Sequence, residues 1–505
     1  MPPRPAVNKI IKLTALDGAA VEYVDEIIGS GGMKDVYFSP NKSYVVAFFR
    51  DKQDANAKDR LLNLVGTYRD KIFNTPGGEY WQRLYCWPTK IVEHKGKLGL
   101  VVPVYPKHFF FEFGSKNNDF LGIRGKEKEG KWFASASNQN KFLDPREKGT
   151  WLSYFRICIL VSRAVRRLHA AGLAHSDLSY KNVLIDPKGG NASIIDIDGL
   201  VVPGKYPPDV VGTPDFIAPE VFATKHLPKG DAARKLPSIA TDRHALAVLI
   251  YMYLFYRHPL RGGKVNDLDP QKDEELSMGA KALFVENPKD ASNRPNLKQI
   301  KPSYLPWADV AAVPYTIAGP YLKTLFDRSF IEGLHQPSAR PTADEWEQGL
   351  VKTIDLLQPC SNQRCEQRWF VYDGVGKALC PFCRSPYRAA VPVLEFFSTR
   401  GGGKATPDNH RLMVYSNLYL YPWHVNRNVF PNEKLTESQK RPVGYFVFHD
   451  SKWVFVNQTL PGMRDVGANV EVPIGSMLEL VDGQQILFSE EEGGRMVLVQ
   501  LAPSA

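Results

Sequence analysis

Three polar side chains within one short stretch have types and spacing that could perform chemistry together. Asp177, Asn182 and Asp196 lie in residues 175–199, which contain the runs His-Ser-Asp-Leu-Ser-Tyr-Lys-Asn and Ile-Ile-Asp-Ile-Asp-Gly. Transfer of a γ-phosphoryl group to a hydroxyl requires a carboxylate that orients the acceptor, then an amide and a second carboxylate that hold Mg²⁺ on the nucleotide. The stretch therefore predicts a phosphoryl-transfer centre. The alternative is a polar loop in which Asp177 and Asn182 only form turns.

The neighbouring segments predict elements that would position these side chains. Apolar residues recur at helical spacing over residues 151–172, which predicts a helix leading into the loop. Short β-branched runs at 183–185 and 192–195 predict a small hairpin. Such a hairpin would present Asn182 and Asp196 to the same ion.

The spacing His-x-Asp-x4-Asn resembles the catalytic loop of protein kinases, and further kinase motifs follow in order. Gly212–Glu220 resembles the end of an activation segment, which finishes in Ala-Pro-Glu. Asp242 resembles the aspartate of a buried helix that braces the catalytic loop, although it is also a candidate helix N-cap. Arg340, within Arg-Pro-Thr, resembles the arginine that pairs with the Ala-Pro-Glu glutamate, here Glu220. The resemblance implies a bilobal α+β kinase fold.

A glycine-rich turn near the N-terminus predicts a phosphate-binding loop, because glycines let backbone N–H groups approach phosphates. The glycines expected to contact the nucleotide are Gly29, Gly31 and Gly32. Lys34 replaces the third glycine of the kinase pattern, and Phe49 stands where the next strand normally carries its lysine. This combination resembles the with-no-lysine kinases and implies that Lys34 binds the phosphates. The alternatives are a solvated Lys34, or Arg50 in that role with the register shifted by one.

The kinase resemblance implies further nucleotide contacts. Val104 and Tyr105 would form the hinge that receives adenine. The predicted helix over residues 52–73 lacks the glutamate that usually pairs with the lysine, so Asp59 or, less favoured, Asp54 would substitute for it.

A second carboxylate follows the predicted metal-binding aspartate. Asp196 occupies the position of the aspartate in the Asp-Phe-Gly motif, and Asp198 lies two residues later. Asp198 would either touch a second Mg²⁺ or cap the following turn, since magnesium commonly takes one or two protein carboxylates. The predicted magnesium ligands are therefore Asn182, Asp196 and Asp198.

The segment after this motif lacks the parts of a phosphorylation switch. Ser176 precedes Asp177, where phosphorylation-activated kinases carry an arginine, and Tyr206 provides the only hydroxyl side chain between Gly199 and Val211. We therefore expect no ordering of this segment by Ser/Thr phosphorylation.

Four of the six cysteines follow the kinase-like region in the pattern C-x4-C-x14-C-x2-C. They are Cys360, Cys365, Cys380 and Cys383. Two cysteine pairs at this spacing predict a structural zinc ribbon or knuckle. Two disulfides are the alternative, which the lack of an export signal disfavours.

Residues 389–505 contain short β-type runs separated by Gly, Asn and Asp turns, which predict a small sandwich or barrel. Residues 453–457 and 475–483 resemble the second half of a forkhead-associated domain. The phosphothreonine-reading elements of that family are not evident, so a docking or autoinhibitory module is equally compatible with the sequence.

The motifs predict four parts in 505 residues. These are a kinase N-lobe at 1–106, a C-lobe at 107–358 with a surface insertion around 114–150, a four-cysteine zinc knuckle at 359–388 and an all-β domain at 389–505. The combination resembles the bacterial kinases of the TerY, phosphatase and kinase triad linked to tellurite resistance. That resemblance implies a von Willebrand factor A type protein and a metal-dependent phosphatase as partners.

The function expected from these features is a Ser/Thr protein kinase that uses ATP with Mg²⁺ or Mn²⁺ and also phosphorylates itself. The alternative is a nucleotide-binding pseudokinase that acts as a scaffold. The net charge of +10 is dispersed without a nucleic-acid motif, so nucleic-acid binding is disfavoured. The N-terminus has no apolar signal region and no apolar run is long enough to span a bilayer, so we expect a cytoplasmic protein without membrane contact.

Overall fold

The computed structural model describes residues 9–31, 33–75, 77–202, 205–206, 212–228, 230–304, 306–387, 389–399 and 405–503. The chain forms two compact units. Unit 1 comprises residues 1–148, 160–305 and 328–344, and unit 2 comprises residues 149–159, 306–327 and 345–505.

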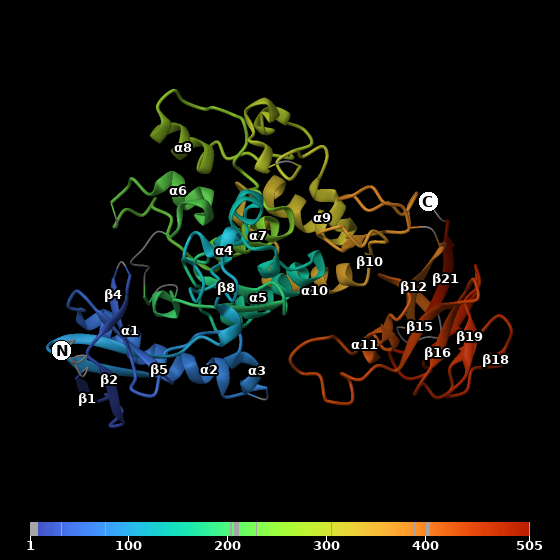
Figure 1. The fold of residues 1–505 in the computed structure, drawn as a ribbon, viewed down its shortest axis with the longest axis horizontal. Helices are drawn as coiled ribbons and strands as arrows, with labels where there is room; N and C mark the ends of the chain where they lie inside the picture. The colour runs from blue at the N-terminus through green and yellow to red at the C-terminus, as the bar shows by residue number, and fades with distance from the viewer. Residues whose placement is uncertain are drawn as a thin grey trace. The chain divides into compact units, whose positions relative to one another are not determined.

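Unit 1 opens with a five-stranded antiparallel sheet in the order β3-β4-β5-β7-β6 (Figure 1). Its strands are β3 (Ile27–Ser30), β4 (Lys34–Phe38), β5 (Tyr44–Phe49), β6 (Lys90–His94) and β7 (Lys97–Pro103). A separate hairpin of β1 (Ile10–Thr14) and β2 (Ala20–Val24) precedes it and shares its core, to which Val21, Val46 and Val101 belong. Strand β2 ends at Val24 and β3 begins at Ile27, so two residues separate the hairpin from the sheet.

The predicted helix over 52–73 is present but interrupted. It consists of α1 (Ala55–Asn63), a π-helical turn (Leu64–Tyr68) and α2 (Arg69–Phe73), and α3 (Gly78–Gln82) follows. Asp54 is the N-cap of α1, where its carboxylate accepts a hydrogen bond from the Ala57 backbone N at 2.7 Å. Asp54 therefore caps the helix and does not serve as a partner for Lys34.

The remainder of unit 1 consists of helices joined by long irregular segments, and its apolar helix α7 (Ile239–Phe255) is buried along nearly its whole length. Around it lie α5 (Trp151–Ala170), whose first residues belong to unit 2, α6 (Pro219–Thr224) and α8 (Pro270–Met278). The predicted hairpin is confirmed as β8 (Val183–Asp186) paired with β9 (Asn191–Ile194). Within the described residues, no helix combines the length and apolarity that a membrane crossing requires.

The segment 114–150 is packed into unit 1 although it contains only short helical turns such as α4 (Lys116–Asp119). Lys128 and Glu147 are both buried and form an ion pair with Nζ and Oε2 3.0 Å apart. The Glu147 carboxylate also accepts hydrogen bonds from the backbone N atoms of Phe113 and Gly114 at 2.5 and 3.1 Å. The segment predicted as a surface insertion is therefore anchored by a buried ion pair.

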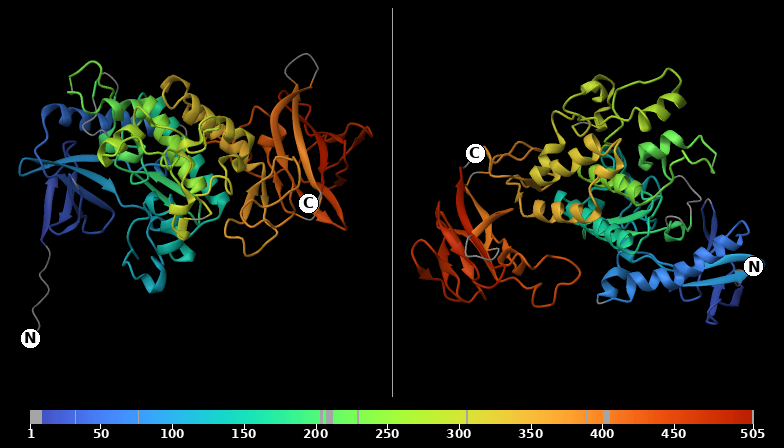
Figure 2. Two further views of the ribbon diagram at one scale, coloured as in Figure 1. Left: turned by 90° about the horizontal axis from the view of Figure 1, so that it is seen from above. Right: turned by 180° about the vertical axis from the view of Figure 1, so that it is seen from behind.

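Unit 2 is dominated by antiparallel β-structure, seen in orange and red in Figures 1 and 2. One sheet has the order β13-β12-β21-β20-β17-β18 and the other has the order β14-β15-β16-β19. The strands are β12 (Val391–Thr399), β13 (Ala405–Met413), β14 (Tyr419–Leu420), β15 (Gly444–His449), β16 (Lys452–Asn457), β17 (Arg464–Asp465), β18 (Val470–Glu471), β19 (Met477–Glu479), β20 (Gln485–Leu487) and β21 (Arg495–Ala502).

The two sheets share one core, in which Phe396, Phe446, Phe455 and Val497 are buried. The all-β character of residues 389–505 is thereby confirmed for the described part. The remaining elements of this unit are α9 (Gly319–Asp327), most of α10 (Ala343–Ile354), the short pair β10 (Leu357–Pro359) and β11 (Trp369–Val371), and α11 (Pro422–Val425).

Candidate active site

A cavity of about 520 Å³ in unit 1 lies between the glycine-rich strands and the predicted catalytic loop. The predicted site residues that line it are Gly29, Gly31, Lys34, Val104, Tyr105, Asp177, Asp196 and Asp198. Gly32 lies outside the described residues. Asn182 does not line the cavity but is buried directly behind Asp177. The structure thus brings the glycine-rich strands, residues 102–105 and the catalytic-loop region to one cavity.

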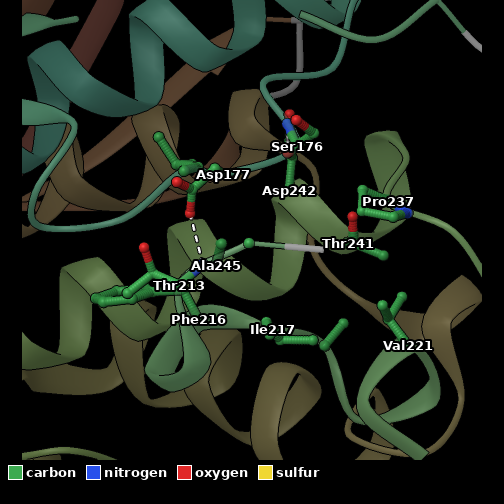
Figure 3. Close-up of a pocket in the computed structure, with 13 residues that line it drawn as sticks. Ser176, Asp177, Thr213, Phe216, Ile217, Val221, Pro237, Thr241, Asp242 and Ala245 are labelled. Carbon is green, nitrogen blue, oxygen red and sulfur yellow. Dashed lines mark hydrogen bonds between the residues drawn. The ribbon is translucent and has the colours of Figure 1, made fainter. Parts of the chain in front are cut away.

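The Asp177 carboxylate is held from two sides by N–H donors. Asn182 Nδ2 donates to Asp177 Oδ2 at 3.0 Å and to the Asp177 carbonyl O at 2.8 Å. The backbone N of Thr213 donates to Asp177 Oδ1 at 2.6 Å, and Figure 3 shows Asp177 pointing toward Thr213. Sequence reasoning missed Thr213, because a backbone donor leaves no signature in residue type.

The loop that carries Asp177 is braced by a buried aspartate of α7. Asp242 Oδ2 accepts a hydrogen bond from the His175 backbone N at 2.7 Å, and Oδ1 accepts one from the Ser176 backbone N at 3.1 Å. Ser176 has a φ of 67°, a backbone conformation that costs energy outside glycine and needs such support. The expected bracing role is therefore present. Asp242 is not the N-cap of α7, because that position belongs to Ser238.

The end of the activation segment is fixed by the ion pair that the kinase resemblance implies. Arg340 Nη1 and Nη2 donate to the two carboxylate oxygens of Glu220 at 2.8 and 2.7 Å. The guanidinium is fully buried and also donates to the backbone O atoms of Gly333, Leu334 and Ala240. Such a two-pronged pair fixes orientation as well as distance.

Lys34 reaches into the cavity from β4 and meets the two carboxylates of the Asp-x-Asp motif. Its Nζ lies 2.6 Å from Asp198 Oδ1 and 3.2 Å from Asp196 Oδ1. Arg50, the alternative phosphate ligand, does not line the cavity. It contacts Ser30, and its Nε donates to Asp35 Oδ1 at 3.0 Å. The geometry therefore places Lys34, and not Arg50, where a phosphate could be bound.

The charges of this cluster depend on one another. Burial opposes the charge of Lys34, but Asp198 and Asp196 outweigh it and raise the pKa of Lys34 above its ordinary value. Burial also opposes the charge of Asp196, yet Lys34 and His175 lower the pKa of Asp196. Burial raises the pKa of Asp198. Lys34 and Asp196 are therefore a charged pair at neutral pH.

Asp59 of α1, which the sequence offers as a partner for Lys34, instead contacts Tyr206. The Asp59 carboxylate accepts a hydrogen bond from the hydroxyl of Tyr206, which also accepts one from Asn63 Nδ2 at 3.0 Å. Tyr206 is buried by this contact although it belongs to the activation segment. No sequence pattern signals this pairing, because the two residues are 147 positions apart.

The donor set beside Lys34 fits a magnesium ion. Mg²⁺ prefers oxygen ligands, and Asp196 offers a carboxylate that is 53% exposed. The Nδ2 atom of Asn182 donates to Asp177, which leaves its Oδ1 as the atom able to bind a cation. Asn182 and Asp196 could therefore hold Mg²⁺ on a bound nucleotide.

The four predicted zinc ligands converge in unit 2. All are free cysteines, and their Sγ atoms lie within 4.8 Å of one another, with Cys360–Cys383 at 3.5 Å and Cys365–Cys380 at 3.9 Å. A tetrahedral zinc ion with Zn–S bonds of about 2.3 Å separates its sulfurs by about 3.8 Å. The cluster therefore fits one structural Zn²⁺.

Comparison with known proteins finds kinase similarity in residues 133–370, which include parts of both units. A sequence model of the protein kinase domain matches residues 133–370. The chain is 37% identical over 103 residues to the death-associated protein kinase dapk-1 of Caenorhabditis elegans, covering 20% of this chain and 6% of that protein. It is 38% identical over 71 residues to the dual serine/threonine and tyrosine protein kinases of Gallus gallus and Homo sapiens, covering 14% of this chain and 8% of each.

The chain thus spans only 6 to 8% of the length of these curated relatives. The stretch matched by the family model contains the catalytic loop, the Asp-x-Asp motif and the Arg340–Glu220 pair described above. Residues 133–370 are therefore similar to the protein kinase domain.

Proposed function

We propose that this chain is an ATP- and Mg²⁺-dependent protein kinase that transfers the γ-phosphoryl group to a serine or threonine hydroxyl, including its own. The observation that carries this proposal is the convergence of Lys34, Asp177 and Asp196 on one cavity of about 520 Å³. Val104 and Tyr105 line the same cavity and would receive adenine. Positioning and charge stabilisation provide nearly all of the catalysis in this reaction, and these residues supply both.

The proposed mechanism assigns a separate task to each side chain. The Asp177 carboxylate accepts the proton of the acceptor hydroxyl while the hydroxyl oxygen bonds to the γ-phosphorus and the bond to the β-phosphate oxygen breaks, which releases ADP. Thr213 and Asn182 hold that carboxylate in place. Lys34 binds the phosphates. When bound by Asn182 and Asp196, Mg²⁺ would neutralise charge on the phosphate oxygens.

Transfer of labelled γ-phosphate from ATP tests this function. With Mg²⁺ or Mn²⁺, we expect the wild type to label itself or a protein acceptor on serine or threonine. Asp177→Ala should lower the rate by about 10²-fold or more, because a positioned acid-base group contributes that much, and should leave ATP affinity nearly unchanged. Asp17→Ala, which removes an exposed carboxylate in the β1–β2 turn outside the cavity lining, is the matched control and should be fully active.

The same assay distinguishes the alternative function. A wild type that binds ATP but transfers phosphate to neither itself nor any protein would contradict the kinase proposal. The nucleotide-binding scaffold would then explain the cavity.

We further propose that Cys360, Cys365, Cys380 and Cys383 hold a structural zinc ion, and that the β-sheets of unit 2 dock partners. The resemblance to kinases of the TerY, phosphatase and kinase triad supports a von Willebrand factor A type protein and a metal-dependent phosphatase as these partners in the cytoplasm. Metal analysis should find one zinc per chain in the wild type and less in Cys380→Ser. A purified wild type without zinc would overturn the metal assignment.

A further inference from the structure

The two carboxylates beside Lys34 differ in distance and burial. Asp198 Oδ1 lies 2.6 Å from Lys34 Nζ, and the Asp198 side chain is 14% exposed. Asp196 Oδ1 lies 3.2 Å away, and its side chain is 53% exposed. An exposed ion pair is weak and readily exchanged, whereas a buried pair is costly to break. Asp198 is therefore the fixed partner of the lysine, and Asp196 is the one free to bind another cation.

The pairing of β4 with β5 places an aromatic ring beside the Lys34 ammonium. In the β4–β5 register, Lys34 is directly opposite Phe49. The Lys34 Nζ lies 5.4 Å from the centroid of the Phe49 ring, within the range of a cation–π contact. Phe49 is 2% exposed, so its ring forms a fixed wall on one side of the lysine. The ammonium is thus held between this ring and Asp198.

Helix α1 does not supply the acid that would otherwise hold this lysine. Residues 52–73 contain no glutamate. Asp54 caps the helix, and Asp59 bonds the Tyr206 hydroxyl. Over the described ranges, Asp196 and Asp198 are the carboxylates that lie within 4.0 Å of Lys34 Nζ.

We propose that Asp198 is a positioning residue that holds the Lys34 ammonium toward the nucleotide phosphates, in the role that a helix glutamate would otherwise fill. Asp196 then binds the metal, and Asp198 is not a magnesium ligand. The inference rests on the proposed nucleotide site. It implies that the lysine and its carboxylate partner function as a pair, although neither lies on the strand or the helix that usually carries it in protein kinases.

A double-mutant cycle tests the pairing in the full-length protein. The first measurement is the Kd for ATP at saturating Mg²⁺ in Lys34→Met, Asp198→Asn and the double variant. The second is the Mg²⁺ concentration that gives half-maximal transfer in the same proteins. We expect each single variant to weaken ATP binding by about tenfold, as the loss of one charge-assisted interaction would. The double variant should bind ATP no more weakly than Lys34→Met alone, and Asp198→Asn should leave the half-maximal Mg²⁺ concentration within about twofold.

Two variants serve as controls. Asp59→Asn removes the other candidate acid and should leave ATP affinity unchanged. Asp198→Glu keeps the carboxylate charge and should retain more ATP affinity than Asp198→Asn. A purely structural role of Asp198 would not require this difference. If Asp198→Asn does not fold, the cycle is run with Asp198→Glu, Lys34→Arg and their double variant, and a double variant that binds ATP no more weakly than Lys34→Arg alone would support the pairing.

The opposite result would assign Asp198 to the metal. A several-fold rise in the half-maximal Mg²⁺ concentration in Asp198→Asn, with additive losses of ATP affinity in the double variant, would overturn the pairing. Because the additivity of the cycle is read from ATP binding and not from transfer, the loss of ATP affinity in the double variant still decides the pairing if the wild type transfers no phosphate. The failure of the kinase function and the failure of the pairing are therefore distinguishable.

Discussion

The cavity has a catalytic-loop wall, which carries Asp177, and a strand wall, which carries Lys34. Different kinds of contact hold these two walls. On the catalytic-loop wall, backbone N–H groups fix the functional carboxylates, with Thr213 donating to Asp177 and His175 donating to Asp242. On the strand wall, Lys34 is held by side chains, namely Asp198 and the Phe49 ring. Backbone donors are tied to the fold, so the carboxylates that use them must stay where they are. A pair of side chains, by contrast, can be replaced by an equivalent pair at other sequence positions, provided that both members are replaced.

The largest expected effect comes from the buried side-chain pair that fixes the end of the activation segment. Arg340→Ala would leave the Glu220 carboxylate and three backbone O atoms without their donor. Breaking a buried pair in this way typically lowers the free energy of unfolding by about 3–5 kcal/mol. Urea unfolding measures the loss. Lys440→Ala, which breaks the exposed pair with Glu437, is the control and should cost less than about 1 kcal/mol. Equal losses in the two variants would contradict the distinction between buried and exposed pairs.

A smaller effect is expected from the brace under the catalytic loop. Asp242→Asn keeps the shape but replaces one acceptor oxygen by an N–H₂ group that faces a backbone donor. The loss of one hydrogen bond to a charged group is worth about 1.5–3 kcal/mol, so we expect kcat to fall by about tenfold or more as the loop shifts. Steady-state kinetics should show the KM for ATP nearly unchanged. A large rise in that KM with an unaltered kcat would show that Asp242 supports the strand wall instead.

The loop wall was largely predictable from the sequence, whereas the strand wall was only partly so. Asp177, Asn182 and Asp196 lie in one short stretch, so their spacing carries most of their geometry. Lys34 and Asp198 are 164 positions apart, and neither helical nor strand periodicity connects them. The sequence therefore predicted a role for Lys34 at the cavity but offered acids of α1 as its partner, whereas Lys34 Nζ lies 2.6 Å from Asp198 Oδ1.

The smallest expected effect is the pH response of His258, a buried neutral histidine next to Asp215. His258 contacts the Asp215 backbone O through Nε2 at 2.8 Å, and its Nδ1 accepts from the Leu260 backbone N at 3.1 Å. Burial lowers the pKa of His258 to about 4, which outweighs the opposing effect of Asp215 and Glu274, while Arg261 adds to the lowering. The unfolded chain therefore binds more protons between pH 6.5 and 4, so stability is retained above this window and is lost as the pH falls through it.

This linkage predicts that unfolding at pH 5.5 costs about 1 kcal/mol less than at pH 7 on account of His258 alone. The measurement compares urea unfolding of the wild type and His258→Gln at the two pH values. The variant should lack this part of the pH dependence. An identical pH dependence in both proteins would show that His258 is charged or exposed in the folded state.

The central claim is that Lys34 performs the task of the lysine missing from β5. Its most direct test is the single-turnover rate of γ-phosphate transfer from ATP in the wild type, Lys34→Ala and Arg50→Ala. Because Lys34 lines the cavity and Arg50 does not, we expect Lys34→Ala to lose about 10²-fold or more of the rate and Arg50→Ala to stay within about twofold of the wild type. A Lys34→Ala protein that remains active, together with an inactive Arg50→Ala protein, would contradict the account.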